Sequence, residues 1–553
     1  VSVNGEIYNH QELRNDCLSD CSFRTHSDSE VVLHLYLKFG LEGSAQVNGM
    51  FAFVIYDTRS GEVVLGRDRL GIKPLYVAQF NGGVLVGSEL KALLMHPECP
   101  RELNWPDLEP WGSQQKKDVS TYVTGVRHLP PGTCMVLDAD GGYSSHEFWR
   151  FSDHVRHEAD SFDSTTYQQE FGQLLADATV KRLMSDVPVG LYLSGGIDSS
   201  LLAALAAKEN PHLHCFTVVE NTTVASGDAP AAVEVAHELG LPLHAAHFSI
   251  DEICDRFTLR DLERLVAMIE SPRFDPEWLL KSELHKFARQ QVPELKVILL
   301  GQGADEFTGG YSNRAGSSHD NWDEYLNQEV AEDVRFWFGQ ERAISDDLRA
   351  DLNIKHFSEG LGAKVNDYHA KMELHMYQMQ HFNLWHEDRS SSFYSLEARV
   401  PFLDHRLVES LASVPDSAHE TLFWDKAIVR NTLTAVMPDY PIDRPKVPFV
   451  ATEHFSTMDD MALRLSLKIY PAFRMLYQAT NAEPLLDTVK LDDLHDQIVS
   501  GGLERYERAW KLMTMMSLAI FERLCSEPDM YLDLVEEAEP SAPRALSEEE
   551  LGN

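Results

Sequence analysis

The stretch PVGLYLSGGIDSS, residues 188–200, decides the fold of this chain. The apolar run Val189–Leu193 predicts a buried strand, and the following SSLLAALAAKEN predicts a helix that begins near Leu201. The loop between them contains two glycines and aims backbone N–H groups and the helix N-terminus at one point, which predicts an anion site. Asp198 beside this point offers the carboxylate oxygens that Mg²⁺ prefers. A glycine turn that binds nothing is the alternative, and the complete pattern Ser-Gly-Gly-x-Asp-Ser-Ser argues against it.

Strand and helix patterns alternate around this loop. Before it, a helical pattern runs from Tyr167 (YQQEFGQLLADATVKRLMSD); after it come HCFTVV, APAAVEVAHELG and LHAAHFSI. This alternation predicts a parallel, doubly wound α/β sheet. Beyond about Asn313 the pattern is mostly helical. Residues 531–553 are acidic and contain proline, so we expect a disordered tail there.

The residues before Trp149 show a different hydrophobic pattern. They form short apolar or period-2 segments, separated by Gly, Asp and Asn, that predict strands: MFAFVIYD, EVVLGRD, PLYVAQF, GVLVGS and TCMVLDAD. The polar stretch RFSDHVRHEADSFDSTT then predicts a linker. We therefore expect an N-terminal domain over residues 1–155 and a larger domain over residues 156–530, followed by the tail over residues 531–553.

Composition restricts the class of partner. The chain has 553 residues, with 48 Lys and Arg against 87 Asp and Glu, a formal charge of −39. Such a charge repels nucleic acid and anionic membranes, so neither is an expected partner. A site for an anionic ligand would then need local countercharge from Mg²⁺, basic side chains and backbone N–H groups. The seven scattered cysteines indicate a reducing, cytoplasmic setting rather than a disulfide framework.

The loop Ser194–Ser200 resembles the pyrophosphate-binding loop of the N-type ATP pyrophosphatases. With RLMSDVP (residues 182–188), LGQGADE (residues 300–306) and GGY (residues 309–311), the chain resembles class B, glutamine-hydrolysing asparagine synthetase. The resemblance implies an α/β adenine-nucleotide hydrolase-like sheet with a helical C-terminal part. It implies ATP contacts from Leu193, Ser194, Gly195, Gly196, Asp198, Ser199, Ser200, Val218, Leu300 and Gly301, and Mg²⁺ ligation by Asp198 and Asp305.

Three further residues take roles from the resemblance. Arg389, in the blocks EDR and LEARVPFLD, matches an arginine near the aspartate substrate, where its fork could hold a carboxylate. Lys446, in RPKVPF, matches a lysine that neutralises charge on the acyl-adenylate and pyrophosphate. Gln302 stands where the family usually has a glutamate, and glutamine cannot act as a base. Either Gln302 works by hydrogen bonding alone, or the acceptor differs from aspartate.

Four N-terminal blocks, NGEIYN, HSDSE, GMFAF and RDRLGIKPLY, resemble a class II glutaminase domain, an α+β N-terminal-nucleophile-type sandwich that is incomplete here. The resemblance implies that Asn4 and Gly5 form an oxyanion hole and that Glu6 and Asp28 bind glutamine. The family's N-terminal cysteine nucleophile is missing, so the chain as written should not hydrolyse glutamine. We expect a Cys-led segment before Val1 in the complete protein.

The predicted function is an AMP-forming ligase that converts aspartate to asparagine through a β-aspartyl-adenylate. ATP and Mg²⁺ are the expected cofactors, glutamine or ammonia is the nitrogen donor, and a homodimer is a family expectation. The alternatives are a ligase of the β-lactam synthetase kind acting on another carboxylate, or a non-catalytic homologue. The pair His244-x-x-His247 resembles a metal motif, but residues three apart in a strand face opposite sides, so we interpret both as structural.

Overall fold

The computed structural model describes residues 1–80, 83–104, 121–138, 142–159, 161–313, 319–334, 367–442, 457–478, 488–502, 504–536, 543–547 and 550. Among these residues, no helix is both long and apolar enough to cross a membrane. All seven cysteines lie in the described part and are free thiols.

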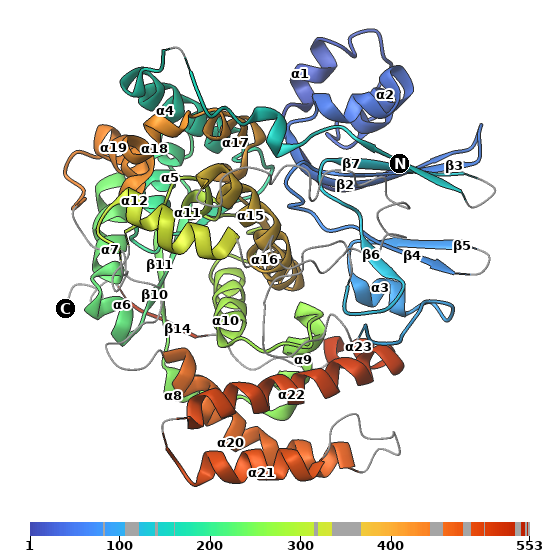
Figure 1. The fold of residues 1–553 in the computed structure, drawn as a ribbon, viewed down its shortest axis with the longest axis vertical. Coiled ribbons are helices and arrows are strands. Elements are labelled where there is room, and N and C mark those ends of the chain that lie inside the picture. Colours follow the sequence, from blue (N-terminus) through green and yellow to red (C-terminus); the bar gives the residue numbers. More distant parts are fainter. Residues whose placement is uncertain are drawn as a thin grey trace.

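The N-terminal part contains two antiparallel sheets that pack face to face (Figure 1). The first has the order β1-β2-β3-β7-β8 and the second the order β5-β4-β6. Helices α1 and α2 cover the outer face of the first sheet through a shared apolar cluster. The five strands predicted from the sequence are all present, and the elements are β1 Ser2–Ile7, α1 His10–Asn15, α2 Glu30–Phe39, β2 Gly49–Asp57, β3 Glu62–Arg67, β4 Tyr76–Phe80, β5 Gly83–Gly87, α3 Leu90–Leu94, β6 Val126–His128, β7 Thr133–Leu137 and β8 Tyr143–Glu147.

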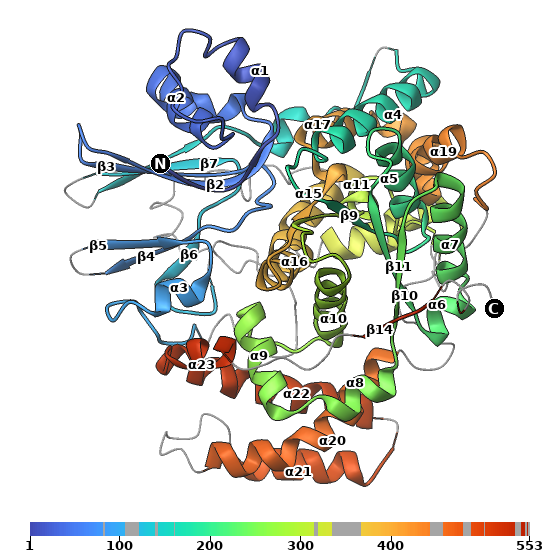
Figure 2. The same cartoon turned by 180° about the vertical axis from the view of Figure 1, so that it is seen from behind.

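The larger part is built on a six-stranded sheet of order β13-β12-β9-β10-β11-β14, in which every neighbouring pair except β11 and β14 is parallel. Alternate residues of β10 enter different cores, because Cys215 packs with α5 and α7 while Phe216 packs with α9 and α10. The sheet is therefore covered on both faces, as expected (Figure 2). Its strands are β9 Val189–Tyr192, β10 His214–Val219, β11 Leu243–His247, β12 Val297–Leu299, β13 Glu397–Arg399 and β14 Arg544–Ala545.

Helices make up most of the remainder, which confirms the helical character expected beyond Asn313. Figure 1 shows α20, α21 and α22 lying together at the end of the molecule opposite α4. The α-helices are α4 Ser164–Lys181, α5 Ile197–Ala207, α6 Asn221–Ala225, α7 Asp228–Leu239, α8 Ile250–Arg256, α9 Leu259–Ile269, α10 Pro276–Gln291, α11 Ala304–Phe307, α12 Trp322–Tyr325, α15 Tyr368–His381, α16 Asn383–Phe393, α17 His405–Ala412, α18 Asp416–Phe423, α19 Ala427–Val436, α20 Thr457–Gln478, α21 Thr488–Val499, α22 Arg505–Ser526 and α23 Met530–Glu536.

Two boundaries differ from the sequence expectation. Helix α5 begins at Ile197 rather than near Leu201, because Gly196 is extended and serves as its N-cap. Asp198 therefore sits in the first turn, where the helix dipole favours a negative charge. The tail expected to be disordered is ordered in its described residues. In α23, the side chains of Tyr531 and Leu534 are buried in the core. Strand β14 pairs with β11 and so extends the edge of the parallel sheet.

Candidate functional site

The first loop, residues 194–200, leaves the carboxyl end of β9 and enters α5. Gly195 has φ +79°, and a Cβ there would lie 2.2 Å from the carbonyl oxygen of Asp228, so only glycine fits. The hydroxyl groups of Ser194 and Ser199 lie 3.0 Å apart, and Ser199 also donates to the Gly196 carbonyl. These bonds fix the loop from within. The loop leads directly into the N-terminus of α5, and the N–H groups and dipole of a helix N-terminus favour an anion.

The second loop runs beside the first. Strand β12 pairs in parallel with β9, and Leu299 is opposite Leu191, so the residues after both strands emerge together. A Cβ on Gly301 would lie 3.2 Å from the Cβ of Asp198, which shows how closely the loops approach. On the other side of β9, the Leu193 N–H donates to Phe216 of β10. The predicted nucleotide residues Leu193, Ser194, Gly195, Gly196, Asp198, Ser199, Ser200, Val218, Leu300 and Gly301 thus gather at the carboxyl edge of three adjacent strands.

Asp198 and Asp305 share one ammonium group. Lys426 Nζ lies 2.8 and 2.6 Å from the two carboxylate oxygens of Asp198 and also contacts Oδ1 of Asp305. The Lys426 side chain is 4% exposed. Burial alone would lower the pKa of Lys426, but attraction to the two carboxylates outweighs burial and raises the pKa above its ordinary value. The site therefore contains a buried cation between two acidic loops.

Sequence analysis missed Lys426. The lysine precedes α19, and both Asp425 (φ 51°) and Lys426 (φ 55°) adopt the left-handed conformation that non-glycine residues avoid. Such a conformation costs about 1–3 kcal/mol per residue, so its surroundings must enforce it. The Asp425 N–H donates to the Ser312 hydroxyl, and the Arg430 guanidinium donates to both the carbonyl and the carboxylate of Asp425. The only sequence signal was a lysine that directly precedes an amphipathic helix.

The same residues fit a divalent cation. Carboxylates from two neighbouring loops reach a single cationic atom, and carboxylate oxygens are the ligands that Mg²⁺ takes in proteins. Gly310 keeps this arrangement compact, because a Cβ there would lie 1.9 Å from Asp305 Oδ1 and 2.3 Å from Lys426 Cε. Asp198 and Asp305 are therefore the residues that could hold Mg²⁺, with Lys426 as fixed countercharge beside them.

Gln302 faces a buried carboxylate. Its Nε2 lies 3.4 Å from Glu387 Oε2, at the limit of a hydrogen bond. Glu387 is also close to Lys281 and His285, at 3.4 and 3.1 Å. Burial opposes ionisation of Glu387, but the positive charges of Lys281 and His285 outweigh it and hold its pKa at about 2. A glutamate at position 302 would place a second carboxylate against Glu387, whereas the amide of Gln302 donates to it.

Arg389, predicted to lie near the aspartate substrate, is held by protein groups of both parts of the molecule. Its side chain is fully buried, its Nε donates to Glu270 at 3.0 Å, and its Nη2 donates to the hydroxyl of Tyr76 at 2.6 Å and to the carbonyl of Ser88. The guanidinium fork thus binds a carboxylate of the protein and two groups of the N-terminal part. These contacts place Arg389 at the interface between the two parts, and its predicted role near the substrate remains a prediction. Lys446 lies outside the described residues, so its predicted role remains a prediction.

The predicted glutamine-binding residues lie on or beside β1. The Asn4 amide donates to the Ser88 hydroxyl at 3.1 Å, and the carboxylate of Asp28 accepts the Ile7 N–H at 2.7 Å. Gly5 has φ +125°, and a Cβ there would lie 2.0 Å from the Met50 carbonyl oxygen. Asn4, Gly5, Glu6 and Asp28 are therefore brought together.

Glu6 also contacts the larger part, because Arg399 Nη2 lies 3.0 Å from its Oε1. Burial raises the pKa of Glu6 to about 7; Arg399 opposes the shift, while Glu397 and Asp28 add to it. A carboxylate with this pKa changes its charge close to neutral pH.

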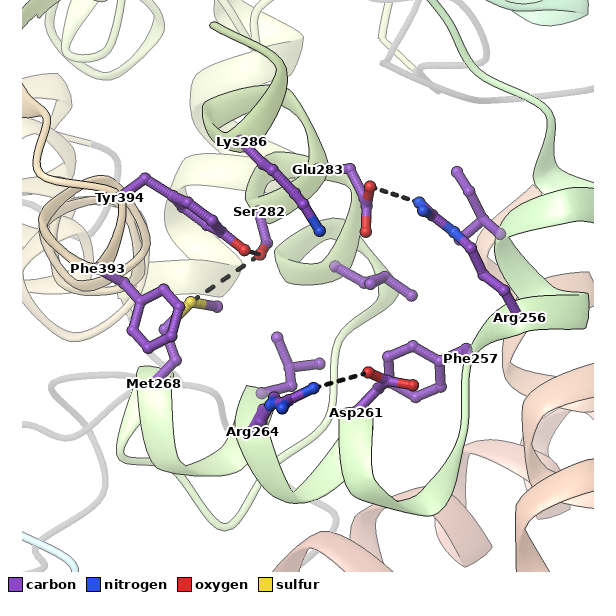
Figure 3. A pocket seen from close by; sticks show the side chains of 13 residues that line it. Arg256, Phe257, Asp261, Arg264, Met268, Ser282, Glu283, Lys286, Phe393 and Tyr394 are labelled. Atoms are coloured by element: carbon purple, nitrogen blue, oxygen red, sulfur yellow. Dashed lines mark hydrogen bonds and ion pairs between the residues drawn. The ribbon is translucent and has the colours of Figure 1, made fainter. Parts of the chain in front are cut away.

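A histidine pair and a pocket lie outside the predicted site. His244 and His247 lie in β11 as expected, and His244 pairs with His214 across the sheet at 3.1 Å. A separate pocket lies among α8, α9, α10 and α16 (Figure 3). Its ionic side chains pair with one another, Arg256 with Glu283 and Arg264 with Asp261.

Two loops at the carboxyl edge of a parallel sheet, with two carboxylates and a fixed ammonium between them, define a phosphate-handling α/β enzyme. Comparison with known sequences agrees and is more specific. The family described as asparagine synthase matches residues 170–523, and the glutamine amidotransferase domain matches residues 1–149. The chain belongs to the asparagine synthase family and is a ligase of this type.

Several curated relatives are similar over most of the chain. The chain is 30% identical to asparagine synthetase [glutamine-hydrolyzing] 2 of Bacillus subtilis, covering 98% of this chain and 74% of the relative. It is 29% identical to asparagine synthetase [glutamine-hydrolyzing] 3 of the same species, over 82% of this chain and 76% of the relative. Asparagine synthetase B [glutamine-hydrolyzing] of Escherichia coli is also 29% identical, over 83% of this chain and 71% of the relative.

Proposed function

We propose that this chain converts aspartate to asparagine in an ATP-dependent, AMP-forming reaction, with glutamine or ammonia as nitrogen donor. The observation that carries the proposal is the convergence of Asp198, Asp305 and Lys426 beside the loop that starts α5. Adenylation releases pyrophosphate, so it needs positive charge beside the β- and γ-phosphates. The family membership and the names of the relatives supply the acceptor and the donor.

The protein's own residues would act in the following way. The N–H groups at the start of α5 and the hydroxyls of Ser194 and Ser199 bind the phosphates of ATP. Bound at Asp198 and Asp305, Mg²⁺ would supply Lewis-acid charge neutralisation. Lys426 holds a permanent charge where negative charge accumulates as the aspartate carboxylate attacks the α-phosphate and pyrophosphate leaves. Ammonia then attacks the acyl carbon of β-aspartyl-AMP, and AMP departs. Lys446 is proposed as a second cation for the same step.

The domain bounds, the glutamine-binding residues and the cellular setting are also part of the proposal. We assign residues 1–155 to an N-terminal-nucleophile-type glutaminase domain and residues 156–530 to a synthetase domain of the adenine-nucleotide hydrolase type. The two packed sheets and the parallel sheet support these assignments. Asn4, Gly5, Glu6 and Asp28 are proposed to bind glutamine. Free thiols support a cytoplasmic setting, the net charge of −39 disfavours nucleic-acid and membrane partners, and a homodimer rests on the family alone.

The decisive experiment incubates the protein with MgATP and aspartate, with ammonium in one reaction and glutamine in another. Asparagine, AMP and pyrophosphate should form in equal amounts with ammonium, and the glutamine reaction tests the N-terminal part separately. Formation of ADP instead of AMP would overturn the mechanism. A chain that makes no AMP with any amino-acid acceptor would be the non-catalytic homologue.

A second candidate keeps the chemistry and changes the acceptor. Gln302 favours it, because the family usually has a glutamate there and the amide is held near Glu387. Another carboxylate substrate would then be adenylated. Exchange of labelled pyrophosphate into ATP, measured with aspartate and with other carboxylates in competition, separates the two candidates.

A further inference from the structure

Four side chains that could bind a metal ion converge away from the nucleotide loops. They are His157, which follows the N-terminal part, Asp367 and His369 at the start of α15, and Asp416, the first residue of α18. One ligand atom from each lies within 4.8 Å of all the others. Neither the predicted mechanism nor the family comparison assigns them a role. The mixture of two imidazoles and two carboxylates distinguishes this cluster from a patch of surface acids.

The orientation of His369 is the observation that points to a cation. Its side chain is 2% exposed, and its Nε2 lies 3.1 Å from the Val414 carbonyl oxygen, an acceptor that requires this nitrogen to carry the proton. In the neutral ring Nδ1 is then a bare lone pair, and it has no hydrogen-bond donor among the described residues. Nδ1 lies 3.5 Å from a carboxylate oxygen of Asp367 and 3.5 Å from one of Asp416. A lone pair that faces two carboxylates is repelled unless a positive charge lies between them.

The ligand atoms lie somewhat further apart than in a closed tetrahedral site. In such a site, ligands about 2.05 Å from the metal are about 3.3 Å from one another. His157 Nδ1 lies 3.2 Å from Asp416 Oδ1, and His369 Nδ1 lies 3.5 Å from one oxygen of Asp367 and 3.5 Å from one of Asp416. The shortest approach of His157 to Asp367 uses the other ring nitrogen, Nε2, at 3.9 Å, so binding of one ion would require the exposed His157 ring to move.

The surroundings hold the ligands in place as they do in known metal sites. The carbonyl that accepts from the second nitrogen of His369 fixes its ring and tautomer. The Asp367 carboxylate is fixed by the His369 N–H at 2.9 Å, and the Asp416 N–H donates to the His157 carbonyl at 3.2 Å. Two imidazoles disfavour Mg²⁺ and Ca²⁺, which take oxygen ligands, and favour Zn²⁺. We propose that His157, Asp367, His369 and Asp416 bind one Zn²⁺ ion in a structural site.

The site would tie three segments together. His157 belongs to the stretch that leads out of the N-terminal part, and α15 and α18 both belong to the larger part (Figure 1). Helix α18 has eight residues, about 12 Å, and ends directly before Trp424–Lys426. A metal ion at its first residue would hold the helix that positions Lys426. Because the whole of α18 separates Asp416 from Lys426, the effect of the ion would be on metal content and stability.

The test measures zinc in the full-length protein. The chain is stripped with a chelator, incubated with Zn²⁺ in the presence of excess Mg²⁺ and ATP to occupy the nucleotide site, and passed through gel filtration before metal analysis. The double variant H157N/D416N removes two ligands at solvent-exposed positions, so folding should be retained. The matched control H212N/D439N removes one exposed histidine and one exposed aspartate elsewhere.

After gel filtration, the zinc content of the wild type and of the control should exceed that of H157N/D416N by one ion per chain. Zinc should raise their melting temperature and leave that of H157N/D416N unchanged. With Co²⁺ in place of zinc, they should show the strong visible absorption of a tetrahedral site. Equal zinc content in the wild type and H157N/D416N, or no zinc retained by the wild type, would overturn the proposal.

Discussion

Replacement of Lys426 by methionine removes the cation between the nucleotide loops while keeping the length of the side chain. Unit charges 2.6 Å apart interact by about 6 kcal/mol at an effective dielectric constant of about 20. Desolvation of the ammonium offsets much of this, and the two carboxylates are about one-fifth exposed, so we expect the free energy of unfolding to fall by about 2–3 kcal/mol. Loss of a fixed charge at developing negative charge should slow adenylation by about 10²–10³-fold.

Two measurements check this prediction. Pyrophosphate exchange into ATP, with saturating aspartate and Mg²⁺, measures adenylation, and chemical denaturation measures stability. The exposed Lys208, replaced by methionine in the same way, is the control and should change neither. A K426M variant that keeps pyrophosphate exchange within about threefold of wild type, a difference of less than about 0.7 kcal/mol, would refute the role assigned to Lys426.

Other predictions follow from the same geometry. G310A should lower AMP formation at least tenfold, since its Cβ would lie 1.9 Å from Asp305 Oδ1; unchanged kinetics would contradict the close packing. Q302E should make acceptor turnover depend on pH near neutrality, because its carboxylate and that of Glu387 would share a proton; a flat pH profile would count against that contact. A raised folded-state pKa of about 7 means that the Glu6 contribution to stability is complete below about pH 4.5 and is lost as pH rises through 7. The E6Q variant should therefore show a weaker dependence of the free energy of unfolding on pH. An unchanged pH dependence would contradict this contribution of Glu6. Chelation of Mg²⁺ should abolish AMP formation, and activity that survives chelation would exclude Asp305 as a necessary ligand.

The sequence predicted the parallel sheet and its first loop because their signals are local. An apolar strand, two glycines and a helix directly follow one another in residues 188–207, so neighbouring residues alone determine the geometry. The start of α5 was misjudged by four residues because Gly196 acts as the N-cap, which hydrophobic periodicity does not report. The order of α23 was missed for a related reason. The acidic composition of the tail concealed two apolar side chains that reach the core.

Residues whose role depends on a distant partner could not be predicted in this way. Lys426 becomes functional because α18 and α19 bring it to Asp198, which is 228 positions earlier in the chain. Arg389 was assigned to the substrate because it matches a family arginine that lies near aspartate. The structure shows that such a carboxylate exists, but that it belongs to Glu270 of the protein itself. The residue type indicated a carboxylate partner, but the sequence alone could not identify Glu270 as one.

The ion pairs between the two parts of the molecule have a further consequence for the proposed coupling of glutamine and nucleotide sites. Buried ion pairs contribute little net stability, but loss of one partner leaves an unpaired buried charge, so they specify one orientation of the parts. Glu6 of β1 bonds to Arg399 at the end of β13, and the carbonyl of Arg399 accepts the N–H of Leu300, the residue before Gly301. The same arginine therefore contacts a predicted glutamine-binding residue with its side chain and a nucleotide-loop residue with its backbone. This shared residue acts together with the apolar clusters in which side chains of both parts pack, so the two proposed sites keep a fixed relative position.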